Sequence, residues 1–184
     1  MKSLILGAVI LFVASCSLPG EFVFPEVAKI QATYKEFPKL AEAIRGASDL
    51  TLYEGLPHQM FEKEQLELEL KAKETVIQNE FPFYKRPNPV SKADKKLLRE
   101  ICVNAKSFRP FSGFKGCGEF HPDYSLHWLE GKKVAQIQIC FGCHEIRGYF
   151  EGVYVYCEIN GPAMKQLREV LGRYQSQRPR RKKG

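Results

Sequence analysis

The sequence lacks the motifs of several common enzyme classes. It contains no glycine-rich phosphate-binding loop, no H-E-x-x-H pair, no G-x-S-x-G elbow and no paired-carboxylate pattern. His58 follows a proline in a loop and could act as an acid or base, but no nucleophile is tied to it by spacing. We therefore expect a non-catalytic protein.

Long hydrophobic runs are also scarce, because the only one is Leu4–Ala14. A run of about eleven apolar residues is too short to cross a bilayer as a helix. Residues 16–184 contain no second hydrophobic span, no internal repeat and no long low-complexity stretch. This length suits one domain with a proper core.

The N-terminus has the parts of an export signal in the expected order. Met1-Lys2-Ser3 carries one positive charge, the apolar run follows, and Val13-Ala14-Ser15-Cys16 places a cysteine after small residues. An ordinary secretory signal, or a buried N-terminal helix of a cytosolic protein, would also accommodate the apolar run. The position of the thiol favours a more specific interpretation.

Residues 1–16 resemble a bacterial lipoprotein signal with its lipobox. The resemblance implies diacylation of Cys16, cleavage before Cys16 and acylation of the new amino group, so that residues 1–15 are a signal peptide. Two or more acyl chains hold a protein firmly on a membrane. Because Ser17 rather than Asp follows Cys16, the resemblance favours the outer membrane if the organism is Gram-negative. Residues 16–26 are then a lipidated tether.

The net charge of +7 is concentrated at the C-terminus, where five of the last seven residues are basic. The remaining body is close to neutral, and an exported lipoprotein has little access to DNA, so we expect no nucleic-acid partner. Residues 176–184 are predicted to be a disordered basic tail, which could contact anionic surfaces.

Hydrophobic periodicity predicts a single α+β domain over residues 27–175, with an antiparallel meander sheet packed against a few helices. Helices are expected over residues 27–47, 61–73, 92–105 and 161–174, with a kink at Pro38 and an N-cap at Ser91. Strands are expected over residues 50–56, 75–83, 124–128, 134–146 and 153–159.

The segment Cys140-Phe141-Gly142-Cys143-His144 resembles the C-x-x-C-H motif of c-type cytochromes. The resemblance implies thioether bonds from both cysteines to a covalent haem and an iron ligand at His144. In that family the motif lies on a helix, whereas the composition here favours a strand. In a regular strand the two cysteines would face opposite ways, about 10 Å apart.

Two other arrangements remain open for these cysteines. Cys117 and His121 form a C-x3-H pair, which together with Cys140 and Cys143 could bind zinc as a Cys3His site. A hairpin centred on Phe150 would place Cys143 opposite Cys157 and allow a disulfide. A Cys140–Cys143 disulfide would need a bulge or turn. The simplest alternative is that the thiols are buried or disulfide-linked and that His121 and His144 are ordinary polar contacts, so no cofactor is predicted.

The body is similar to uncharacterised bacterial lipoproteins that carry a Cys-Phe-x-Cys segment on a strand. This resemblance covers mainly residues 117–159 and implies no known activity. The sequence therefore predicts a lipid-anchored envelope protein with a binding or structural role and an unidentified protein partner. The alternative is a haem protein for electron transfer, or a metal protein, centred on Cys140, Cys143 and His144.

Overall fold

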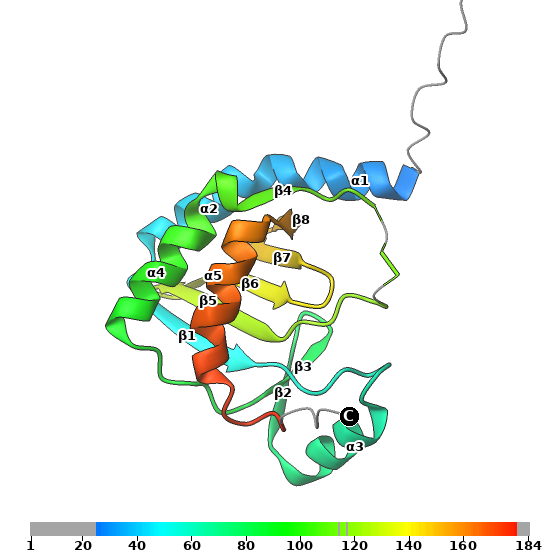
Figure 1. Cartoon of the computed structure of the whole chain (residues 1–184). Coiled ribbons are helices and arrows are strands. Elements are labelled where there is room, and N and C mark those ends of the chain that lie inside the picture. Colours follow the sequence, from blue (N-terminus) through cyan, green and yellow to red (C-terminus); the bar gives the residue numbers. More distant parts are fainter. Residues whose placement is uncertain (1–24, 114, 117, 180–184) are drawn as a thin grey trace, which may run out of the picture.

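Six short segments pair into one antiparallel sheet, which forms the centre of the molecule (Figure 1). The computed structural model describes residues 25–113, 115–116 and 118–179. The predicted signal peptide, Cys16, Cys117 and residues 180–184 therefore lie outside the described residues. The strand order is β1-β5-β6-β7-β8-β4, with the bounds β1 Asp49–Glu54, β4 Phe108–Pro110, β5 Tyr124–Glu130, β6 Lys133–Cys140, β7 Glu145–Phe150 and β8 Val153–Ile159.

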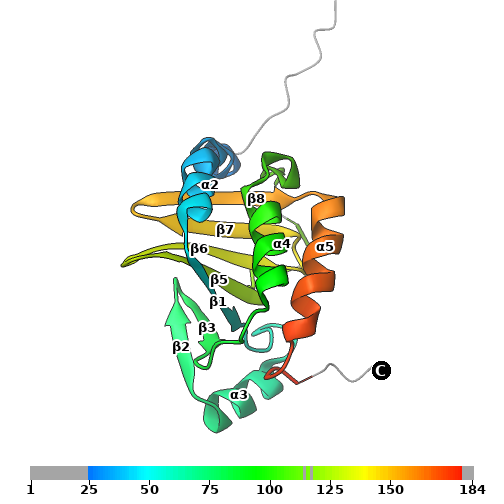
Figure 2. The ribbon, with the colours of Figure 1, turned by 90° about the vertical axis from the view of Figure 1, so that its left-hand side faces the viewer.

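Helices cover one face of this sheet. In Figure 2, α2 (Phe37–Gly46), α4 (Lys92–Val103) and α5 (Gly161–Leu171) lie side by side across the strands. Ser91 caps α4 by accepting a hydrogen bond from the backbone of Asp94, as predicted. α1 (Pro25–Thr33) precedes α2, and a short 3₁₀ turn separates the two helices before Pro38.

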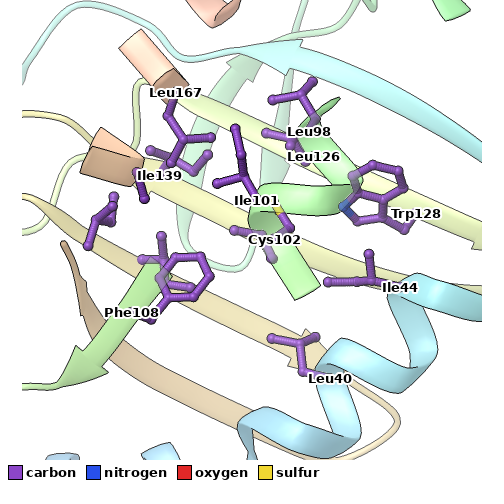
Figure 3. Close-up of a cluster of buried hydrophobic side chains, with 14 of the residues drawn as sticks. Leu40, Ile44, Leu98, Ile101, Cys102, Phe108, Leu126, Trp128, Ile139 and Leu167 are labelled. Carbon is purple, nitrogen blue, oxygen red and sulfur yellow. The ribbon is translucent and has the colours of Figure 1, made fainter. Parts of the chain in front are cut away.

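The main core lies between these helices and the sheet. Figure 3 shows its side chains converging from α2, α4, α5, β5 and β6. Every second residue of β6 enters this core, namely Ala135, Ile137 and Ile139. The residues between them face the other side of the sheet, so that Cys140, the last residue of β6, belongs to a second, smaller buried cluster. The α+β class, with one compact domain, is confirmed.

A two-stranded hairpin, β2 (Thr75–Gln78) and β3 (Phe81–Tyr84), contacts this second side of the sheet through polar groups. Gln138 donates its side-chain amide to the carbonyl of Gln78 at 2.8 Å. The Nε2 of His127 donates to the Gln78 side chain at 2.9 Å. Burial lowers the pKa of His127 to about 4, so its ring is neutral at pH 7. α3 (Lys63–Ala72) lies just before the hairpin in the chain.

Two strand predictions were wrong because each hid a turn. Residues 75–83 form the β2–β3 hairpin rather than one strand, and its turn residues Asn79 and Glu80 have φ angles of 44° and 77°. Residues 134–146 are likewise divided between β6 and β7. The helix predicted from residue 27 begins at Pro25, so it includes the last two residues of the predicted tether.

Both edges of the sheet are partly closed. β4 covers only the end of β8 and finishes at Pro110, while Tyr156 further along β8 donates its backbone N–H to the Thr33 hydroxyl at 2.9 Å. At the other edge, isolated bridges join Leu52 of β1 to Asn88, and Gly55, which follows β1, to Phe83. Within the described part of the chain, no helix combines the length and apolar character needed to cross a membrane.

Candidate functional site: a dithiol pocket

The two cysteines of the C-x-x-C-H segment lie at a tight hairpin loop. Cys140 pairs with Glu145 at the ends of β6 and β7, so residues 141–144 form a four-residue turn. His144 closes this turn with a φ of 60°, in the left-handed region that non-glycine residues seldom adopt. The predicted placement on a continuous strand, with the cysteines on opposite faces, was therefore wrong.

The turn brings the two cysteines together. The backbone N–H of Cys143 donates to the Sγ of Cys140 at 3.3 Å. The Sγ of Cys143 lies 3.8 Å from the carbonyl oxygen of Glu119. A side-chain hydrogen bond with Cys143, with smaller contributions from the backbone of His121 and of Cys143, lowers the pKa of the Cys140 thiol in spite of its burial. Both cysteines are thiols in this structure.

A cavity of about 600 Å³ opens beside this pair. We call it the dithiol pocket. Its wall is formed by residues from five parts of the chain, namely His58, Phe61, His121, Asp123, Cys140, Phe141, Gly142, Cys143, Arg168, Gln175, Arg178 and Pro179. The lining therefore combines two thiols and two imidazoles with aromatic rings and guanidinium groups.

The two histidine rings of the pocket contact each other and the neighbouring backbone. Their centroids are 4.5 Å apart in an edge-to-face arrangement. The Nε2 of His121 donates to the carbonyl of Leu56 at 2.9 Å. The Nδ1 of His58 accepts the backbone N–H of Met60 at 3.0 Å. These bonds fix the orientation of both rings at the pocket wall.

Phe141 is held from two sides, which fixes the start of the turn. Its N–H donates to the carboxylate of Asp123 at 2.7 Å, and its carbonyl accepts from Arg168 at 2.6 Å. The Arg168 guanidinium also lies 4.8 Å from the centroid of the Phe141 ring. No local sequence pattern points to Asp123 or Arg168, because both act on Phe141 from distant parts of the chain.

The C-terminal segment forms another part of the wall, and this corrects the predicted tail. The backbone N–H groups of residues 176–178 all donate to the carboxylate of Glu54, at 2.9 to 3.0 Å. Arg178 forms ion pairs with Asp123 at 2.8 Å and with Glu62 at 2.6 Å. Residues 176–179 thus belong to the folded domain, and the remaining predicted tail, residues 180–184, lies outside the described residues.

Beneath Cys143, a charged network anchors the loop that contains Lys115. Lys115 donates to the carbonyl of Cys143 at 2.8 Å and lies 3.0 Å from the carboxylates of both Glu145 and Glu158. Burial alone would raise the pKa of Glu158, but hydrogen bonds from Ser112, Lys115 and Arg109 outweigh it and lower the pKa to about 2. Both carboxylates are therefore held by neighbouring donors.

The predicted Cys143–Cys157 disulfide is not formed. β8 pairs Cys157 with Ile146, three positions from the expected register, because the β7–β8 turn is centred on Glu151 and Gly152 rather than Phe150. Cys157 is a thiol that faces the main core, whereas Cys143 belongs to the second cluster. Cys102 is also a buried thiol, as predicted, and burial raises its pKa to about 12.

The haem and zinc hypotheses are not supported by this geometry. His144 is exposed at the turn, whereas Cys140 and Cys143 are buried, so the three side chains do not converge as a covalent haem site requires. His121 lies at the pocket wall and Cys117 is outside the described residues. Within residues 25–113, 115–116 and 118–179, no three His, Cys, Asp or Glu side chains are grouped to hold a metal ion.

Comparison of the chain with protein-family models, with curated proteins and with solved structures gave no match. A role for the domain must therefore be argued from the geometry of the dithiol pocket.

Proposed function

We propose that the chain is an exported lipoprotein, anchored through Cys16, whose domain binds a small ligand in the dithiol pocket. The cavity carries this proposal, because its volume of about 600 Å³ lies within the usual range for small-molecule sites. The lipobox-like residues 13–16 support the anchor, and Ser17 favours the outer membrane in a Gram-negative cell.

The lining of the pocket favours a partly apolar ligand with a polar group. Phe61 and Phe141 offer aromatic surface, and the histidine rings and thiols offer directional polar contacts. The fixed position of Phe141, between Asp123 and Arg168, means that the wall is formed before the ligand arrives. A preformed wall lowers the ordering cost of binding.

The anchor is tested by Cys16→Ala in cells that process lipoproteins. We expect the variant to leave the membrane fraction and to lose the acyl mass seen on the wild-type protein. Ser17→Ala is the matched control and should stay membrane-bound. A Cys16→Ala protein that remains as firmly bound as the wild type would contradict the anchor.

The pocket is tested by filling it. Gly142 lines the cavity, and a Cβ added there would meet only the Cys140 sulfur, at 4.0 Å, so that Gly142→Phe should fold. Small aromatic amides and carboxylates that raise the melting temperature of the wild type should bind Gly142→Phe at least about tenfold more weakly. Gly161→Phe, at an open position outside the pocket, is the matched control. If no compound shows this dependence on Gly142, the binding role of the pocket is refuted.

A further inference from the structure

The four described cysteines fall into two chemically different pairs. Cys102 and Cys157 are fully buried in the main core, where burial raises the pKa of both thiols. Cys140 and Cys143 instead share one turn and line the dithiol pocket. Only this second pair has both a neighbouring thiol and a cavity through which a reagent can approach.

The spacing of the second pair suits a reversible disulfide. The Cys140 sulfur already lies 3.3 Å from the backbone nitrogen of Cys143, so rotation of one side-chain torsion can bring the Cys143 sulfur to it. The chain reverses between them, which brings their α-carbons within the range of about 7 Å that a disulfide requires. The continuous strand predicted from the sequence would keep them about 10 Å apart, too far for a disulfide.

The surrounding donors distinguish the two sulfurs. The Sγ of Cys140 accepts the backbone N–H of Cys143 at 3.3 Å, which stabilises its thiolate. The Sγ of Cys143 is instead the donor to the carbonyl oxygen of Glu119 at 3.8 Å, which favours its protonated form. Cys140 is therefore the better nucleophile and Cys143 the better resolving thiol.

From this geometry we propose that Cys140 and Cys143 form a redox couple that exchanges with disulfides entering the dithiol pocket. The proposal deepens the proposed function and rests on it only in taking the same pocket as the binding site. It identifies the ligand class as a disulfide carried by a small molecule or an extended peptide.

The exchange has two steps. The Cys140 thiolate bonds to one sulfur of the incoming disulfide, whose S–S bond breaks, and the departing sulfur takes up a proton. Cys143 then loses its proton, and its sulfur bonds to Cys140 and releases the second half of the ligand as a thiol. The two cysteines are thereby oxidised by two electrons, and the incoming disulfide is reduced to two thiols.

The pocket also restricts which disulfides can react. Cys140 and Cys143 are only 2% and 4% exposed, so the incoming sulfur must enter the cavity. Oxidised glutathione and a short peptide with an internal disulfide should fit. A disulfide buried in a folded protein should not, which gives the experiment a way to separate the sources.

The experiment uses the full chain, purified in detergent, reduced, and then freed of reductant. Oxidised glutathione should convert it to a species two hydrogens lighter, with peptide mapping showing a Cys140–Cys143 link. Cys143→Ser should stop at a mixed disulfide between glutathione and Cys140. Cys140→Ser should react at least about 100-fold more slowly. Cys157→Ala, in the main core, is the matched control and should oxidise like the wild type.

Two results would overturn the inference. In the first, Cys140 and Cys143 remain reduced in excess oxidised glutathione and in excess peptide disulfide. In the second, the wild-type protein forms a different link, such as Cys117–Cys143. Either result concerns the wild type, so it does not depend on the folding of a variant. Neither would affect the release of Cys16→Ala from membranes or the Gly142-dependent binding, so the failures are distinguishable.

Discussion

The C-terminal segment should satisfy a buried carboxylate of the domain, although its sequence resembles a loose basic tail. Glu54 is only 1% exposed, and its carboxylate accepts three backbone N–H groups from residues 176–178. A chain that ends at Gln175 loses all three donors together with Arg178. A chain that ends at Pro179 keeps them and loses only residues 180–184, so it is the matched control.

The burial of Glu54 sets the free-energy cost of removing its hydrogen-bond donors. Leaving a buried carboxylate without its partners costs about 3 to 5 kcal/mol. The shorter chain no longer needs to order four residues, which returns about 4 to 8 kcal/mol, at about 1 to 2 kcal/mol per ordered residue. These two free-energy terms are of similar size and opposite sign, so the truncation alone does not isolate the contribution of Glu54. A substitution of Glu54 changes only the carboxylate and therefore isolates it.

Urea denaturation tests this reasoning with four proteins, which are the two truncated chains with and without Glu54→Gln. The effect of Glu54→Gln on the unfolding free energy should have opposite signs in the two chains. In the chain that ends at Pro179, Glu54→Gln should destabilise the fold by about 1 to 2 kcal/mol, because a charge-assisted set of hydrogen bonds is weakened. In the chain that ends at Gln175, the same substitution should stabilise the fold, because it removes an uncompensated buried charge. If Glu54→Gln has the same effect in both chains, Glu54 does not hold this segment.

Three further results are expected. His127→Gln should flatten the pH dependence of the unfolding free energy between about pH 6.5 and 4. Burial holds the pKa of His127 at about 4 in the folded state, so the unfolded chain binds the proton first and the wild type loses up to about 3 kcal/mol of stability as the pH falls through this window. An unchanged pH profile in the variant would show that His127 titrates normally. Glu158→Gln should cost about 2 kcal/mol at pH 7 in urea denaturation and remove the acid loss between about pH 4.5 and 2, because the lowered pKa of about 2 stabilises the fold above pH 4.5. Gly55→Ala should lower the melting temperature in calorimetry by several degrees, since its Cβ would lie 2.1 Å from the backbone oxygen of Pro122. Gly46→Ala is the control, because its Cβ meets only ordinary contacts. Equal changes in melting temperature for the two variants would refute this packing argument.

The elements that the sequence predicted well are those with local signals. β8 has the predicted bounds because alternating residues are flanked by a glycine turn and by Asn160. α4 and α5 also begin where expected, since Ser91 caps the first and Pro162 occupies the first turn of the second. In each case, the residues that set the boundary lie within a few positions of it.

The turns that were missed lack those local signals. The β2–β3 turn uses Asn79-Glu80 at positive φ, where the usual second residue is glycine. The turn at residues 141–144 has Gly142, but its positive φ falls on His144. Strand-forming residues on both sides of each turn then predict a single strand, and this error placed Cys143 within a strand rather than in a turn.

The dithiol pocket could be predicted only in part, because most of its wall is built from long-range contacts. The C-x-x-C spacing identified Cys140 and Cys143, and the sequence also singled out His58 and His121, which line the pocket. Asp123, Arg168 and Arg178 reach the pocket from a strand end, a helix and the C-terminal segment. Their partners are 18 to 116 positions away in the chain, beyond the range of any local pattern.

The partly closed sheet edges would have a consequence for copies of the protein if the domain is anchored on a membrane as we propose. Anchored proteins meet one another in two dimensions, at high local concentration and with similar orientation, and open strand edges invite pairing between copies. Here the outer edge of β8 is shared between Thr33 and a strand that ends at Pro110, while Asn88 bridges to β1 and Phe83 to the residue that follows β1. Among the described residues, little regular backbone at these two edges remains for a neighbouring copy to extend, so an anchored domain would be suited to crowding without forming continuous sheets.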